Sequence, residues 1–339
     1  MSNLKEREIS LQHFLREHGW QQAQRIKISG DASFRQYERL CRTNQQSAML
    51  MDAPPPKERI DHFLKIAKIL HKMEISVPEI LAADLQQGFI IMEDLGDNTY
   101  TRLLQTGYEE KKLYQLACDL LIHIRHHSDP PILAQLSPFD LNKVLREVQV
   151  FTEWYWPMIH KTPIPAATLQ EYVEIWQHIF QTTASPHQVL THFDFHVDNL
   201  MVLPNKPGIK ACGLLDFQDA VQGPAVFDLM SLIDDARRDV GQALGTQLIH
   251  RYQSAFPQDH REEFDASYAL FAAQRHTRIL GTFVRLFKRD AKPGYLQFIP
   301  RVWKQLESAL EHPSLVPLKN WFADHFPAKI RNNPLSLKA

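Results

Sequence analysis

Two histidines, two aspartates and an asparagine occur in the short run THFDFHVDNLMV, at positions 191 to 202. His192, Asp194 and Asn199 form the pattern H-x-D-x-x-x-x-N, and a second run, GLLDFQDA, places Asp216 after an apolar segment. Phosphoryl transfer from ATP uses such groups: one carboxylate orients the attacking hydroxyl, while a second carboxylate and an amide hold Mg²⁺. A structural polar turn is the alternative, because the first pattern alone is weakly specific.

Short strands are predicted on both sides of these polar residues. HQVLTHF precedes Asp194, LMVL follows Asn199, and IKACGLLDF leads into Asp216. Strands of this kind hold a catalytic base on a rigid loop and place a metal ligand at the end of a neighbouring strand. The two runs together therefore favour a catalytic site over a polar turn.

The pattern of apolar residues changes along the chain from mixed to mainly helical. The elements predicted before residue 98 are a helix at 9–17, strands within 21–28, 33–40 and 46–53, a helix from 57, and strands at 78–84 and 88–94. Helical spacing then predominates, at 108–127 and from 224 onwards, and SPFD at 137–140 predicts a helix that begins at a Ser137 cap. We therefore predict an α+β, bilobal fold, with a strand-rich N-lobe at 1–95 and a helical C-lobe at 96–339.

The composition excludes several other classes of protein. The formal net charge of −1 gives no reason to expect binding to nucleic acid or to anionic lipid. Cys41, Cys118 and Cys212 are odd in number and far apart, which fits a reducing compartment better than a disulfide framework. No apolar run approaches the roughly 18 residues of a membrane span. We expect a cytoplasmic protein without a nucleic-acid or membrane partner, and infer no obligate protein partner.

Glycine-containing motifs are also informative by their absence. The sequence has no G-x-G and no G-K-[ST], which removes the dinucleotide fingerprint and the Walker phosphate loop. G-x-S-x-G and H-E-x-x-H are absent as well, so α/β-hydrolases and zincins have no local support.

Linked motifs resemble a known family. HFDFHVDN followed by LLDFQDAVQGPAVFDLMSL resembles the catalytic core of the aminoglycoside phosphotransferase-like kinases, and the resemblance covers nearly the whole chain. Within that family, GDASFRQYERL, LMDAPPPKE, GFIIMEDLGD and QRHTRILGTFVRLFKRDAKPGYL resemble the bacterial anomeric kinases of N-acetylmuramate and N-acetylglucosamine. The resemblance implies a protein-kinase-like fold that binds ATP and Mg²⁺ between its lobes. It also implies phosphorylation of the C1 hydroxyl of an amino sugar in peptidoglycan recycling.

The resemblance implies roles for individual residues. Asp194 would be the catalytic base, His192 would brace its loop, and Asp228 would anchor that loop from the next helix. Asn199 and Asp216 would hold magnesium. The implied nucleotide-binding residues are Gly30, Asp31, Ala32, Ser33, Phe34 and Arg35 over the phosphates, and the backbone of Glu93, Asp94 and Leu95 at the adenine. The candidate substrate-binding residues are His196, Asp198, Arg275, Arg289 and Tyr295.

Several of these assignments have structural alternatives. His196 and Asp198 either contact the substrate or support the loop. The basic side of a helix predicted at 274–289 either reads the lactyl carboxylate of N-acetylmuramate or is simply solvated. Outside the motifs, HIRHH at 123–127 has the spacing of a metal site, but a solvated helix end is favoured. In FTEWYWP at 151–157, core packing is favoured over stacking of an aromatic ring on a sugar.

One position departs from the family. Met51 occupies the place where related kinases carry a phosphate-gripping lysine, and GDASFR has a single glycine. Arg35 is the candidate substitute, because a guanidinium binds phosphate bidentately, with an exposed strand arginine as the alternative. The missing lysine leaves open a nucleotide-binding pseudokinase. A kinase for another small alcohol, such as an aminoglycoside, choline or homoserine, is the other alternative.

Overall fold

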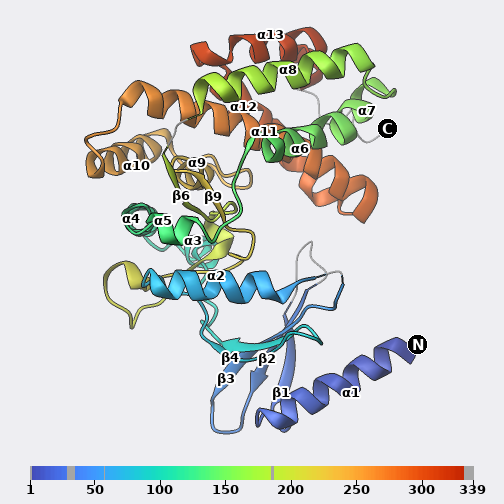
Figure 1. Ribbon diagram of the computed structural model, residues 1–339, viewed down its shortest axis with the longest axis vertical. Helices are drawn as coiled ribbons and strands as arrows, with labels where there is room; N and C mark the ends of the chain where they lie inside the picture. Colours follow the sequence, from blue (N-terminus) through green and yellow to red (C-terminus); the bar gives the residue numbers. More distant parts are fainter. Residues whose placement is uncertain (1, 29–34, 57, 185–186, 332–339) are drawn as a thin grey trace. The chain divides into compact units, whose positions relative to one another are not determined.

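The computed structural model of the chain describes residues 2–28, 35–56, 58–184 and 187–331. It divides into two compact units (Figure 1). The sheet unit comprises Met1–Leu120 and Val197–Ala220, and the helical unit comprises Leu121–His196 and Val221–Ala339. The lobe boundary expected between residues 95 and 96 stays a prediction.

The sheet unit contains five antiparallel strands in the order β1-β2-β3-β5-β4. Their bounds are β1 (Gln24–Ile28), β2 (Gln36–Cys41), β3 (Ser47–Asp52), β4 (Ile80–Asp84) and β5 (Phe89–Glu93). Four of them lie within a segment that the apolar pattern predicts as a strand, and β2 extends one residue beyond its predicted segment, to Cys41. The α+β fold class, with a small sheet region followed by a mainly helical remainder, is therefore confirmed.

Strand β5 of this sheet is buried on both faces. Successive side chains of a strand point to opposite faces, and β5 is apolar at four consecutive positions, Phe89 to Met92, all buried. Helix α1 (Ser2–Glu17) packs Phe14 and Leu15 into a core that includes Leu50 and Ile91. Helix α2 (Ile60–Lys72) is drawn on the other side of the strands in Figure 1.

A short hairpin completes the sheet unit and presents the predicted metal ligands. The remaining elements of this unit are α3 (Tyr100–Gln105), α4 (Glu110–His126), which continues into the helical unit, η2 (Val197–Asn199), β7 (Leu200–Val202), η3 (Gly208–Ala211) and β8 (Cys212–Leu214). Strands β7 and β8 pair antiparallel, with Leu200 opposite Leu214. The backbone N–H of Leu215 donates to the carbonyl of Asn199 at 2.9 Å. This pairing brings Asn199 and Asp216 to the same end of the hairpin.

All three cysteines belong to the sheet unit, in different environments. Cys41 on β2 is partly exposed, whereas Cys118 on α4 and Cys212 on β8 are fully buried. The Tyr100 hydroxyl donates to Cys212 Sγ at 3.2 Å, and burial raises the pKa of the Cys212 thiol to about 12. None of the three described cysteines forms a disulfide bond.

The helical unit is built around one long helix, α11 (Arg261–Asp290), whose middle is buried on most sides. The other elements of this unit are α5 (Pro130–Leu133), α6 (Leu141–Val150), η1 (Phe151–Tyr155), α7 (Trp156–His160), α8 (Ala166–Thr183), β6 (Gln188–Thr191), β9 (Val221–Pro224), α9 (Phe227–Ile233), α10 (Gln242–Ala255), η4 (Pro293–Phe298), α12 (Ile299–Leu310), η5 (Pro313–Leu315), α13 (Val316–His325) and α14 (Ala328–Arg331). Strands β6 and β9 form an antiparallel pair.

A close approach of α11 to the π-helical segment η1 depends on a glycine. A Cβ atom on Gly281 would lie 2.3 Å from the carbonyl oxygen of Val150 and 2.6 Å from the backbone nitrogen of Phe151. These neighbours are backbone atoms that cannot move independently of their helices. Only glycine therefore fits at this contact.

The start predicted for α6 is wrong by one short turn. Helix α6 begins at Leu141, and Asp140 rather than Ser137 is its N-cap, accepting from the Lys143 N–H at 2.8 Å. Both residue types are good caps, so local preference alone does not choose between them. The predicted core role of the aromatic run is confirmed for Trp156, which is 4% exposed and contacts Trp321.

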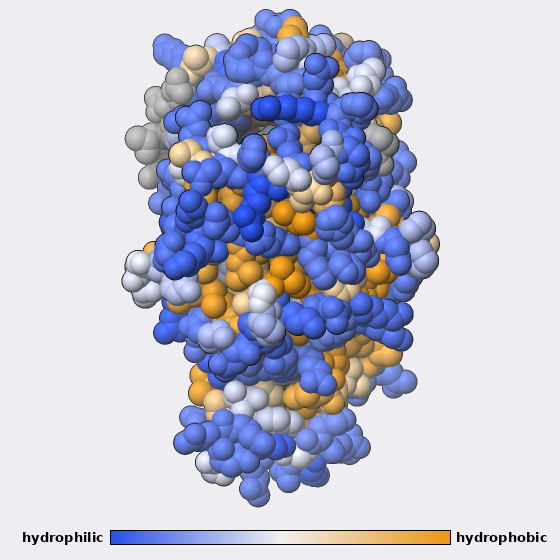
Figure 2. Space-filling view, turned by 90° about the vertical axis from the view of Figure 1, so that its left-hand side faces the viewer, coloured by the Kyte–Doolittle hydropathy of each residue, from blue (hydrophilic) through white to orange (hydrophobic). Residues whose placement is uncertain are grey.

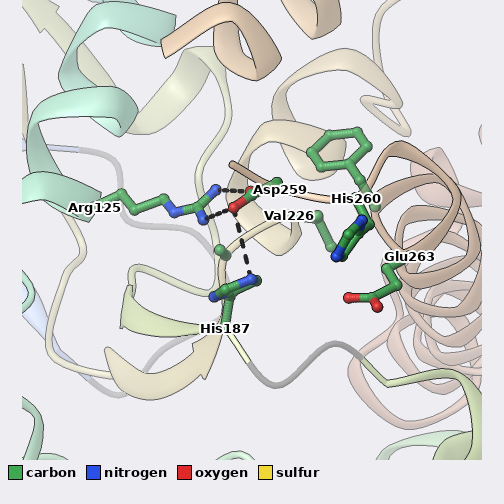
Figure 3. A pocket seen from close by; sticks show the side chains of 8 residues that line it. Arg125, His187, Val226, Asp259, His260 and Glu263 are labelled. Atoms are coloured by element: carbon green, nitrogen blue, oxygen red, sulfur yellow. Dashed lines mark hydrogen bonds and ion pairs between the residues drawn. The ribbon is translucent and has the colours of Figure 1, made fainter. Parts of the chain in front are cut away.

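The end of α4 is held by a nearly buried ion pair. Arg125 binds Asp259 through two bonds of 2.6 and 2.8 Å, and the two side chains are only 9% and 11% exposed. His187 Nε2 lies 3.6 Å from the same carboxylate, at the edge of a small pocket (Figure 3). In the segment HIRHH, the His123 ring stacks on the His127 ring, with 3.9 Å between the ring centroids. No cluster of three or more ligand-type side chains suited to a metal occurs in the described ranges.

The face drawn in Figure 2 is mainly hydrophilic, with hydrophobic side chains between the polar ones. Within the described ranges, every helix is too short or too polar to cross a bilayer.

Candidate active site

The loop after β6 carries Asp194 and is fixed from the start of α9. The Asp228 carboxylate accepts the backbone N–H of His192 at 2.6 Å and that of Phe193 at 3.0 Å. Asp228 is 4% exposed, and Phe193 has the left-handed φ of +77°. Such a conformation is costly for a residue other than glycine and persists where neighbouring bonds enforce it. The predicted anchor is thus in contact with the predicted loop.

The two histidines of the motif both lie against Asp194. His192 Nδ1 accepts the Asp194 backbone N–H at 3.3 Å, and His196 Nε2 lies 3.4 Å from Asp194 Oδ2. Both histidines are buried, at 1% and 3% exposed, whereas the Asp194 side chain is 46% exposed. These contacts favour loop support for His196, and they leave the Asp194 carboxylate accessible.

The charges around Asp194 keep it ionised. Burial raises the pKa of Asp194, but the bond from His196 and the nearby cations Arg275 and Arg278 outweigh it. The pKa therefore lies well below its ordinary value. Asp194 is a carboxylate at neutral pH, ready to accept a hydrogen bond from a hydroxyl group.

The basic residues of α11 have different environments. Arg275 is 3% exposed, and Arg278 binds Glu147 at 3.0 Å with its guanidinium 5.0 Å from the centre of the Phe193 ring. Arg289 is exposed and pairs with its neighbour Asp290 at 2.8 Å. At 1.5 Å per residue, Arg289 lies about 21 Å from Arg275 along the helix. The structure therefore brings Arg275 to Asp194 but does not bring Arg289 there.

The sequence pattern missed an acidic pair directly after α9, Asp234 and Asp235. The Asp235 side chain is 1% exposed, and its Oδ1 accepts the Arg237 N–H at 2.8 Å. The Arg237 guanidinium lies 5.9 Å from the centre of the Tyr295 ring, so one predicted substrate residue is near this turn. Burial raises the pKa of Asp234 to about 6. The available signal was two carboxylates immediately after the apolar helix FDLMSLI.

In the sheet unit, Asp216 lies beside a cation. Arg35 Nη2 is 3.4 Å from Asp216 Oδ1, and Arg35 Nε is 3.7 Å from Glu58 Oε2. Asp216 adopts the left-handed φ of +56°, and its side chain is 42% exposed. Arg35, at 13% exposed, is therefore not a solvated strand arginine. Gly30 to Phe34, the rest of the predicted phosphate loop, lies outside the described residues.

The donor set of the β7–β8 hairpin fits magnesium. Asp216 offers a partly exposed carboxylate, and Asn199 offers an amide at the same end of the hairpin. Magnesium in kinases typically takes one or two protein oxygens and completes its shell with phosphate oxygens and water. Two such side chains are enough for that ion, whereas a structural zinc requires about four ligands.

The other predicted nucleotide and substrate residues have mainly structural contacts. Asp94 is bound by Arg39 at 2.7 Å and accepts the Gly96 N–H at 3.0 Å, which shapes the turn after β5. Asp198 accepts a hydrogen bond from the Thr101 hydroxyl. Met51 is fully buried in β3, so no cation is present at that position.

The fold and these two sets of residues define a class, the small-molecule phosphotransferases of protein-kinase-like fold. The chain belongs to the phosphotransferase enzyme family, whose model matches residues 25–266. The resemblance noted from the motifs is thereby confirmed. Enzymes of this class take the phosphoryl group from ATP.

Curated relatives extend over nearly the whole chain. An N-acetylmuramate/N-acetylglucosamine kinase of Caulobacter vibrioides is 35% identical, covering 98% of this chain and 100% of its own length. A protein of the same name from Pseudomonas aeruginosa is 33% identical, covering 88% and 89%.

Solved structures resemble the fold at much lower sequence identity. An ADP-bound aminoglycoside phosphotransferase has a TM-score of 0.57 at 16% identity, covering 88% of this chain and 97% of that one. A choline kinase from Cryptosporidium parvum has a TM-score of 0.59 at 11% identity, covering 93% and 99%. These similarities confirm the kinase-like fold.

Proposed function

We propose that the protein transfers the γ-phosphoryl group of ATP to the C1 hydroxyl of N-acetylmuramate, N-acetylglucosamine or both, as part of peptidoglycan recycling. The observation that carries the proposal is the ionised, partly exposed Asp194 carboxylate on a loop fixed by Asp228. The names of the relatives, which cover nearly the full length, support the amino-sugar acceptor. Dependence on ATP favours a cytoplasmic location.

The helical unit supplies the base. Asp194 accepts the hydrogen bond of the C1 hydroxyl and orients its oxygen towards the γ-phosphorus. As the new O–P bond forms, the bond to the β-phosphate bridging oxygen breaks and ADP leaves, while the hydroxyl proton passes to Asp194. His192 and His196 hold the loop and the carboxylate in place during this step.

The sheet unit supplies the residues proposed for the nucleotide. Asn199 and Asp216 would hold Mg²⁺, which when bound neutralises charge on the phosphates. Arg35 is the proposed substitute for the missing lysine, because it lies beside Asp216 and can bind phosphate oxygens. The backbone of Glu93 to Leu95 would meet the adenine, and Gly30 to Phe34 would cover the phosphates.

The acceptor is proposed to bind over the helical unit. Arg275 lies near Asp194, and Tyr295 offers a half-buried ring near Arg237. Proximity supports a substrate role for these two residues. For Arg289 and Asp198 their local ion pair and hydrogen bond support a structural role instead.

The test is a direct product assay. The protein, ATP and Mg²⁺ are incubated with a panel of sugars and amino alcohols, and the products are read by phosphorus NMR. A sugar 1-phosphate is expected from N-acetylmuramate or N-acetylglucosamine. Asp194→Asn should lower kcat by about 10²–10⁴-fold with ATP binding retained, because general-base catalysis contributes that much. Asp239→Asn, an exposed carboxylate paired with Arg301, is the matched control.

Each remaining alternative gives a different product pattern. Phosphate on an aminoglycoside, choline or homoserine would retain the kinase and reject the amino-sugar assignment. Nucleotide binding without phosphorylation of any acceptor would identify a pseudokinase. Near-normal turnover by Asp194→Asn would remove Asp194 from the base role.

A further inference from the structure

A cluster of buried polar groups lies where the end of α9 meets α11 and α12. Asp235 is only 1% exposed, and its backbone oxygen accepts Gln305 Nε2 at 3.0 Å. The backbone oxygen of Asp234 lies 3.5 Å from both Arg275 Nη1 and His276 Nε2. Three segments distant in the sequence therefore converge on two consecutive aspartates.

Several side-chain atoms of this cluster are buried without a hydrogen-bond partner in the described part of the chain. They are Asp235 Oδ2, Arg275 Nε, His276 Nδ1 and Gln305 Oε1. Most buried polar atoms in folded proteins are hydrogen-bonded, so a group of unmatched atoms calls for a partner, which can be ordered water or a bound molecule. The set combines cationic and neutral donors with acceptors, which suits a polyhydroxylated molecule better than a metal ion.

Arg275 connects this cluster with the proposed base. Its side chain is 3% exposed and interacts electrostatically with both Asp194 and Asp235. An acceptor whose reacting hydroxyl lies at Asp194 would therefore share with Asp235 the electrostatic neighbourhood of one arginine. Because one Asp235 oxygen already binds the Arg237 N–H, the other, which is buried and unmatched in the described part of the chain, is the oxygen left for such a molecule.

We propose that Asp235 is a specificity-determining residue for the acceptor, whose Oδ2 accepts a hydrogen bond from a ring hydroxyl or the amide N–H of the amino sugar. Arg275 fixes the positions of the Asp235 and Asp194 carboxylates relative to each other, so that binding of the sugar ring at Asp235 also orients the C1 hydroxyl at Asp194. This inference rests on the proposed function, since it takes the amino sugar as the acceptor.

The substitution Asp235→Asn isolates this hydrogen bond. The amide oxygen of asparagine still accepts the Arg237 N–H, so the turn after α9 is retained. The other oxygen becomes an NH₂ group, which donates and cannot accept. The variant therefore changes the bond to the acceptor while preserving the local fold, and Asp239→Asn again serves as the exposed control.

The experiment measures kcat and KM for N-acetylglucosamine and for ATP, on the full chain with Mg²⁺, in wild type and both variants. Asp235→Asn should raise the acceptor KM or lower acceptor kcat/KM by about 10- to 100-fold, as expected for a lost hydrogen bond to a charged group. The KM for ATP and the thermal midpoint should stay near wild type. Glucose and the 3-, 4- and 6-deoxy analogues of N-acetylglucosamine are compared in parallel.

The comparison of analogues identifies the sugar group that donates its hydrogen bond to Asp235. Wild type should discriminate against the sugar that lacks this group, and Asp235→Asn should treat that analogue and the parent sugar nearly alike. Unchanged acceptor kinetics, or the same discrimination in both proteins, would overturn the role of Asp235 while leaving the proposed function intact. Absence of amino-sugar phosphorylation by wild type would instead overturn the proposed function and this inference with it.

Discussion

Replacing Asp228 by asparagine should reduce turnover without unfolding the protein. The Asp228 carboxylate accepts two backbone N–H groups, from His192 and Phe193, just before Asp194. An asparagine keeps one acceptor oxygen and turns an NH₂ group towards the second N–H. The cost is one charge-assisted hydrogen bond, about 1.5–3 kcal/mol. The left-handed Phe193 backbone, φ +77°, depends on such bonds and should relax when one is lost.

If losing this hydrogen bond displaces the Asp194 carboxylate, the whole free-energy cost should appear in the activation barrier. The kcat should then drop by about 10- to 150-fold, since about 1.4 kcal/mol corresponds to a factor of ten. Steady-state kinetics with saturating ATP and acceptor measure kcat, and urea unfolding measures stability. Asp239→Asn should match wild type in both assays. Full kcat in a folded Asp228→Asn protein would refute the reasoning, because the two amide bonds would then not position Asp194.

Three further substitutions test other contacts. Burial raises the pKa of Asp234 to about 6, so between pH 4 and 6 the folded state keeps a proton that the unfolded chain has released. The unfolding free energy of the wild type should therefore fall as pH rises through this window, by up to about 2–3 kcal/mol relative to that of Asp234→Asn. Urea unfolding of both proteins at pH 4.5 and 7.5 measures this change. Asp259→Ala leaves Arg125 nearly buried without its partner and should cost about 3–5 kcal/mol in urea unfolding. Gly281→Ala places a methyl group against the Val150 carbonyl and should cost about 1–3 kcal/mol or more, seen as a lower thermal midpoint.

Each of these has a result that contradicts it. A pH-independent difference between wild type and Asp234→Asn would mean that Asp234 does not hold its proton. An Asp259→Ala protein as stable as wild type would mean that the ion pair with Arg125 contributes nothing net. For Gly281, alanine is compared with the same substitution at Gly241, where a Cβ atom meets nothing within 4 Å. Equal midpoints for the two variants would refute the steric argument.

The parts of the site encoded by adjacent residues could be predicted from the sequence. Apolar runs of strand length on either side of polar residues predicted the loop of Asp194 and the hairpin that carries Asn199 and Asp216. Alternation and helical spacing likewise predicted the five strands and the helical remainder. The contact between Asp228 and the loop, 36 and 35 residues away, came from the family resemblance rather than from any local pattern.

What could not be predicted depends on contacts between distant segments. The Asp235 carbonyl meets Gln305, 70 residues later, and the Asp234 carbonyl meets Arg275, 41 residues later. No local periodicity records such pairs, so the acidic pair was not recognised. The choice of the residue that caps α6 was likewise open, and Asp140 rather than Ser137 is its N-cap. Burial also distinguished Arg275 from Arg289, which have the same residue type on one helix.

Because all three cysteines belong to the sheet unit, labelling of thiols reports on the opening of that unit alone. Cys118 and Cys212 are buried and Cys41 is partly exposed, and the helical unit contains no cysteine. A thiol reagent should therefore label the native protein once, at Cys41. The second and third labels should appear only as fast as the sheet unit opens, since a buried, protonated thiol does not react. Counting labels by mass over time, with and without nucleotide, would give the opening free energy of that unit separately from the rest of the protein.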